Sequence, residues 1–92
     1  MLRVIVYDIA DDKRLRLVAK ACEDFGVRVQ KSVFECWLDD DRFEQLWERL
    51  LRIMKPAEDS LMAYVIDDRF ARKRRTAGEG VTVTEKRSVY LF

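Results

Sequence analysis

The chain has no histidine, one proline, three glycines and two cysteines among its 92 residues. Without histidine, and with Cys22 and Cys36 isolated in apolar surroundings, we expect neither a zinc site nor a disulfide. With only Gly26, Gly78 and Gly80 present, the sequence contains no phosphate-cradling glycine loop. These shortages argue against a zinc enzyme and against a regulatory module that binds a small phosphorylated molecule.

Long apolar runs are also missing, so no segment is predicted to span a membrane. The N-terminus opens directly into a strand that carries Arg3, with no apolar signal region in front of it. We therefore expect a cytoplasmic protein that has no membrane partner.

The residues that are present favour one globular domain over positions 1–92, because 49% of them are hydrophobic and 38% are charged. A chain of this length buries only about two thirds of its unfolded surface. Its core is therefore thin, and we expect a homo-oligomer.

Charge is divided unevenly along the chain. Residues 1–68 hold 11 Lys and Arg against 15 Asp and Glu, a net charge of −4, whereas residues 69–92 hold 7 against 2, a net charge of +5. The basic cluster Arg72, Lys73, Arg74 and Arg75 would attract phosphates. A solvated charged loop is an equally good explanation on composition alone.

Hydrophobic spacing predicts six regular elements. Their residues are as follows: a strand at 4–7; a helix that starts at Asp11 or Asp12 and ends at a left-handed Gly26; two strands within 27–37 around a bend at 30–32; a helix that starts at Asp39–Asp41 and ends at Lys55-Pro56; and a strand at 60–66. Capping explains the three consecutive aspartates better than a metal cluster does.

This β-α-β-β-α-β order is typical of a ferredoxin-like α+β sandwich, with both helices on one face of a four-stranded sheet. The other face is apolar and needs a cover. Residues 81–84 and 89–92 are strand-like, so we expect a homodimer in which a C-terminal strand is exchanged. In this division 1–68 is the core, and 69–92 is the basic and dimerising segment.

Asp8 directly follows the first apolar strand and is the leading candidate for a site. An aspartate before a helix more often makes a turn or a cap, so local reasoning leaves both roles open.

Several short motifs together resemble the small CRISPR-associated protein two family, the lesser of two spacer-acquisition proteins. They are Val6-Tyr7-Asp8-Ile9, Asp11-Asp12, Gly26 with Arg28-Val29-Gln30, Ser32-Val33-Phe34-Glu35, and Asp59-Ser60. The resemblance implies a homodimer that cleaves RNA or duplex DNA with a divalent metal and bridges two dimers of the larger integrase.

The resemblance also implies roles for single residues. Asp8 matches the metal-binding aspartate, and Tyr7 is its neighbour on the strand. Arg28 and Phe34 match positions of nucleic-acid contact or site support, with Ser32 between them on the bend. The first helix carries a basic flank that includes Arg14 and Arg16, although departures from the family pattern leave their individual roles unassigned.

Two accounts of Asp8 remain open. Mg²⁺ accepts one or two carboxylates and keeps several waters, so Asp8 from each of two subunits suffices for a weak catalytic site. The chain offers no histidine as a general base, so an architectural scaffold that holds duplex DNA is an equal alternative. A toxin-type ribonuclease of the same fold is a third possibility.

Overall fold

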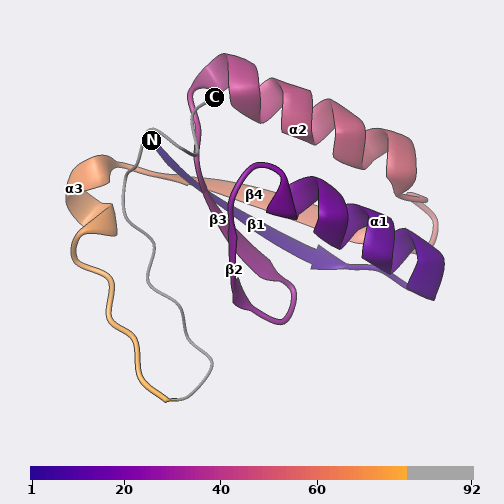
Figure 1. Ribbon diagram of the computed structural model, residues 1–92, viewed down its shortest axis with the longest axis horizontal. Helices are drawn as coiled ribbons and strands as arrows, with labels where there is room; N and C mark the ends of the chain where they lie inside the picture. The colour runs from indigo at the N-terminus through magenta and orange to yellow at the C-terminus, as the bar shows by residue number, and fades with distance from the viewer. Residues whose placement is uncertain (79–92) are drawn as a thin grey trace.

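The computed structural model of the protein describes residues 1–78 (Figure 1). The strands expected at 81–84 and 89–92 lie outside the described residues. In chain order the elements are β1 (Leu2–Asp8), α1 (Asp12–Glu23), β2 (Val27–Gln30), β3 (Val33–Trp37), α2 (Asp40–Ile53), β4 (Ser60–Ile66) and α3 (Asp68–Ala71).

The four strands form one antiparallel sheet in the order β2-β3-β1-β4, and α1 and α2 cover one face of it (Figure 1). The ferredoxin-like order predicted from the sequence is therefore confirmed. β1 pairs with β3 from Leu2 to Val6 and with β4 over its whole length, so its last residue, Asp8, pairs with β4 and extends past the end of the β3 pairing.

The main core lies between the sheet and the two long helices. Alternation along β1 turns Ile5 and Tyr7 to the helix side, where they join Phe34 of β3 and Leu46 and Leu50 of α2. Phe34, Leu46 and Leu50 are fully buried.

Both long helices begin at an aspartate cap, as expected. The Asp11 carboxylate accepts a hydrogen bond from the Arg14 amide at 3.0 Å, and the Asp39 carboxylate accepts one from the Arg42 amide at 2.8 Å. Residues 1–78 hold no cluster of three acidic, cysteine or histidine side chains suited to a metal ion. The three aspartates at 39–41 thus act at a helix start.

The prediction that Gly26 ends α1 in a left-handed conformation is wrong. The helix ends at Glu23 with Asp24 as a right-handed cap, and within the described chain only Gly78 has a positive φ. Gly26 is needed for space instead. A β-carbon there would lie 2.9 Å from the Cα of Cys36 and would also overlap the Cys36 sulfur and the carbonyl of Glu35.

Within residues 1–78, the second face of the sheet is covered at one end only. There Leu2, Trp37 and Ala71 form a small buried cluster under α3, a four-residue helix that the sequence pattern did not predict. Farther along this face, Met62 and Tyr64 of β4 are 50% and 53% exposed. An apolar strip of the sheet is therefore left open to solvent.

Candidate functional site

Asp8 ends β1, where its backbone is in register with Ser60 at the start of β4. Alternation places it on the open face of the sheet with Val4 and Val6. Its side chain is exposed, and its carboxylate makes no hydrogen bond or ion pair with any residue in 1–78. The helix cap is Asp11, so Asp8 keeps both carboxylate oxygens available for a ligand.

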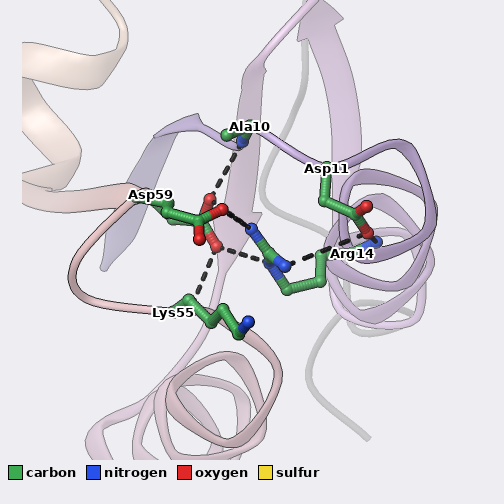
Figure 2. Close-up of polar contacts among 6 residues, drawn as sticks. Ala10, Asp11, Arg14, Lys55 and Asp59 are labelled. Atoms are coloured by element: carbon green, nitrogen blue, oxygen red, sulfur yellow. Dashed lines mark hydrogen bonds and ion pairs between the residues drawn. The ribbon is translucent and has the colours of Figure 1, made fainter.

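A second carboxylate, that of Asp59, precedes Ser60, the strand partner of Asp8, and has the opposite environment. Figure 2 shows its contacts with Ala10, Arg14 and Lys55. Its side chain is fully buried. It accepts backbone hydrogen bonds from Ala10 at 2.9 Å and Lys55 at 2.8 Å. The Arg14 guanidinium donates to it as well, from Nε at 2.9 Å and from Nη2 at 3.2 Å. Every lone-pair direction of this carboxylate is therefore in use.

These bonds hold the pKa of Asp59 well below its usual range; the Arg14 guanidinium has the largest effect, followed by the Lys55 amide. The same contact raises the pKa of Arg14. The network joins the loop before β4 to the loop after β1. Ala10 follows Asp8 by two residues, and Ser60, the residue after Asp59, is the strand partner of Asp8. Asp59 therefore fixes the backbone near Asp8 on both β1 and β4.

Arg14 is turned toward protein rather than solvent. Its side chain is 16% exposed and also donates to Glu58 at 3.0 Å. A nucleic-acid contact by Arg14 stays a prediction, but the structure commits most of its donors to Asp59 and Glu58. The sequence pattern gave no signal for this pairing, which joins residues 45 positions apart.

Four other predicted site residues come together on the helix side of the sheet. Tyr7, Arg16, Arg28 and Ser32 line one cavity of about 240 Å³ between α1 and the β2–β3 turn. The remaining lining residues are Leu15, Ala19 and Lys31. The Tyr7 amide donates to the Ser32 carbonyl at 3.2 Å, so this turn lies beside the end of β1. Tyr7 and Asp8 nevertheless point to opposite faces.

Phe34 supports this cavity from below. It is fully buried, its ring stacks on Tyr7 with centroids 6.2 Å apart, and the Arg28 guanidinium lies over it at 5.2 Å. Phe34 thus holds Arg28 in place and is not exposed for a contact of its own. Burial raises the pKa of Tyr7, with Arg28 opposing the shift, so its phenol is neutral at neutral pH.

The basic cluster after α3 divides into two kinds of side chain. Arg74 forms an ion pair with Glu35 and lies 6.0 Å from the Trp37 ring centroid. Arg72, Lys73 and Arg75 are exposed. Three of the four cations therefore face solvent, and Arg74 links residues 72–75 to β3 through its ion pair with Glu35.

A comparison with known families identifies the family of the chain. The profile described as CRISPR associated protein Cas2 matches residues 1–74. The chain belongs to the Cas2 family.

Relatives and solved structures agree with this assignment. A CRISPR-associated endoribonuclease Cas2 of Chloroflexus aurantiacus is 42% identical over 85 residues, which cover 92% of this chain and 91% of the relative. A CRISPR-associated endonuclease Cas2 of Halalkalibacterium halodurans is 40% identical and covers 79% and 81%. Crystalline Cas2 of Streptococcus pyogenes matches with a TM-score of 0.76 at 37% identity, over 85% of this chain and all of the other.

Two structural findings concern membrane-spanning segments and the cysteines. No helix within residues 1–78 is long and apolar enough to cross a membrane. Cys22 and Cys36 are buried free thiols, and burial raises the pKa of Cys22 to about 12. Both thiols are therefore protonated, unreactive parts of the core.

Proposed function

We propose that this Cas2-family protein is a homodimeric, metal-dependent endonuclease that acts on RNA or duplex DNA, with Asp8 as its catalytic carboxylate. The observation that carries the proposal is the placement of Asp8, an exposed carboxylate without a partner in the described chain, at the margin of an open apolar sheet face. The relatives whose names contain endoribonuclease or endonuclease support the reaction class.

The dimer follows from the open face. Met62 and Tyr64 are half exposed, and Val6 lies in register with Met62 on the adjoining strand. A second copy that packs on this strip by two-fold symmetry would bury it. Asp8 lies on the same face, so the two carboxylates would approach one another across the interface. In this proposal residues 1–68 are the core and 69–92 contribute to dimerisation.

The donor set fits a hard divalent cation such as Mg²⁺. Each chain offers the Asp8 carboxylate, which has no partner within residues 1–78, and Mg²⁺ commonly takes one or two carboxylates while it keeps its waters. When bound, the ion would supply Lewis-acid stabilisation of the phosphate and acidify a water molecule. Asp8 would bind the ion through its carboxylate, and Asp59 keeps the backbone near Asp8 in position through its hydrogen bond from the Ala10 amide.

We further propose a role in CRISPR adaptation, in which the dimer binds duplex DNA and bridges two dimers of the larger integrase. The exposed cations Arg72, Lys73 and Arg75 support sequence-tolerant binding to phosphates. A single carboxylate per chain is a sparse nuclease centre, and this favours the scaffold role over the toxin-type ribonuclease as the protein's main task.

The test is cleavage by purified Asp8→Asn protein, because asparagine keeps the shape and removes the charge. We expect cleavage of RNA and duplex DNA to fall by orders of magnitude, with integrase binding and spacer integration retained. Asp12→Asn is the matched control, since Asp12 is also exposed and lies four residues away. Undiminished cleavage by Asp8→Asn, measured against this control, would exclude Asp8 as the catalytic residue.

A further inference from the structure

The cavity beneath α1 has an unusual balance of charge. Three cations, Arg16, Arg28 and Lys31, line its 240 Å³, and no carboxylate does. Residues 1–68 contain more acidic than basic residues, so their composition alone would not predict a cavity whose charged lining residues are all cations. The cavity is therefore suited to an anion.

Two of these cations are available for a ligand. Arg16 and Lys31 are exposed, and neither forms an ion pair within residues 1–78. Arg28 is only loosely engaged, with its guanidinium 3.7 Å from Glu23 and 3.4 Å from the Lys31 carbonyl. Its guanidinium lies 5.2 Å from the Phe34 ring centroid. Arg28 therefore keeps donors for a phosphate while the ring packs against it.

The rest of the wall is apolar or bears hydroxyls. Leu15 and Ala19 of α1 and the ring of Tyr7 supply flat apolar surface, and Ser32 adds a hydroxyl. A volume of 240 Å³ lies just below the range of about 300–1,000 Å³ for sites that enclose drug-sized ligands. The space suits one phosphate with its attached sugar and part of a base, and it is too small for a duplex.

We propose that this cavity is a binding site for a single phosphate-bearing nucleotide unit, with the phosphate held by Arg16, Arg28 and Lys31 and the sugar against Leu15 and Ala19. Because Tyr7 and Asp8 point to opposite faces, the site is separate from the carboxylate that the nuclease proposal uses. It rests on the proposed function only for its ligand class. The nucleotide can be free or can be the terminal nucleotide of a strand.

The test is titration of the full-length ¹⁵N-labelled protein with adenosine monophosphate in EDTA, followed by NMR. We expect shifts centred on the amides of Tyr7, Arg28 and Ser32. Arg16→Gln and Lys31→Gln should each raise the dissociation constant by at least about fivefold, as expected for loss of a charge-assisted hydrogen bond. Arg52→Gln, an exposed cation on α2 without a described ion pair, should change it by less than about twofold.

A cavity-filling variant tests the shape independently of charge. Ala19→Leu keeps every cation and occupies the apolar wall, so it should weaken binding of adenosine monophosphate without weakening binding of inorganic phosphate. If inorganic phosphate binds the wild type as tightly as adenosine monophosphate does, the nucleotide assignment is overturned. Equal loss of affinity in Arg16→Gln and Arg52→Gln would overturn the site itself.

Two oligonucleotide arms distinguish the sources of the nucleotide. A short strand with a 5′-phosphate should compete with adenosine monophosphate, and the same strand with a 5′-hydroxyl should not, if strand ends are bound. If neither strand competes while the mononucleotide binds, the site takes the free nucleotide. Absence of binding by the mononucleotide and by both strands overturns the proposal. The titration contains no metal, so failure here leaves the Asp8 cleavage test unaffected.

Discussion

At the scale of single residues, the two acids Asp8 and Asp59 have opposite environments although they flank the same strand pair. Asp59 is buried with all its acceptors used, and Asp8 is exposed with none of them used by the described chain. The sequence pattern was sufficient to place Asp8 at the end of the first strand, and the structure has it there, exposed. The pattern does not show which arginines are engaged inside the protein, because Arg14 and its partner Asp59 are 45 positions apart in the sequence and meet only in the folded chain.

Asp59→Asn should destabilise the protein in a pH-dependent way. The folded-state pKa of Asp59 is lowered from 3.8, so its stabilising effect is complete above about pH 4 and is lost as the pH falls below that value. We expect the variant to melt at least about 5 °C below wild type at pH 7, with the gap narrowing toward pH 3. Calorimetry at both pH values measures this. A gap that widens on acidification would contradict the assigned charge state.

Gly26→Ala should cost about 1–3 kcal/mol of folding free energy, because the added methyl group meets backbone atoms of β3 as well as the buried Cys36 sulfur. Urea denaturation measures the loss. An unchanged midpoint would show that β3 can move away from α1. The sequence pattern predicted a special glycine here but gave the wrong reason, because close packing between elements leaves no local signal.

At the scale of elements, all strands and both long helices were predictable, because their apolar spacing and aspartate caps are local. The short helix α3 was not. It spans only Asp68–Ala71, and its buried Ala71 packs against Leu2 and Trp37 from distant strands. Its stability depends on tertiary contacts that a short sequence window does not contain.

The segment after α3 should bind duplex DNA through its exposed cations. Replacing Arg72, Lys73 and Arg75 with glutamine should lower the slope of log affinity against log salt by up to about 0.9 for each cation that neutralises a phosphate. Arg74 is left unchanged, because it pairs with Glu35. Fluorescence anisotropy across a salt series gives the slope. With Arg52→Gln as control, an unchanged slope would locate the DNA-binding face elsewhere.

At the scale of the whole molecule, the proposed dimer would bury the part of the sheet face that is exposed at Met62 and Tyr64. Met62→Lys with Tyr64→Lys should give a monomer in sedimentation velocity, because two charges would enter the interface. Leu51→Lys is the matched control. Leu51 is as exposed as Met62, at 49% against 50%, but lies on α2. A double variant that stays dimeric would place the interface on another surface.

Truncation after Gly80 tests the exchanged strand, which is predicted from sequence alone. We expect loss or weakening of the dimer and a lower melting temperature. A truncated chain that remains a stable dimer with unchanged melting would exclude strand exchange and leave the sheet face as the sole interface.

The most direct test of the account is the position of the metal. Mn²⁺ can replace Mg²⁺ and broadens the NMR signals of nearby amides. In the ¹⁵N-labelled protein we expect broadening centred on residues 6–10 and 59–61, lost in Asp8→Asn and retained in Asp12→Asn. Broadening centred on the aspartates at 39–41, or broadening that persists unchanged in Asp8→Asn, would contradict Asp8 as the metal-binding carboxylate.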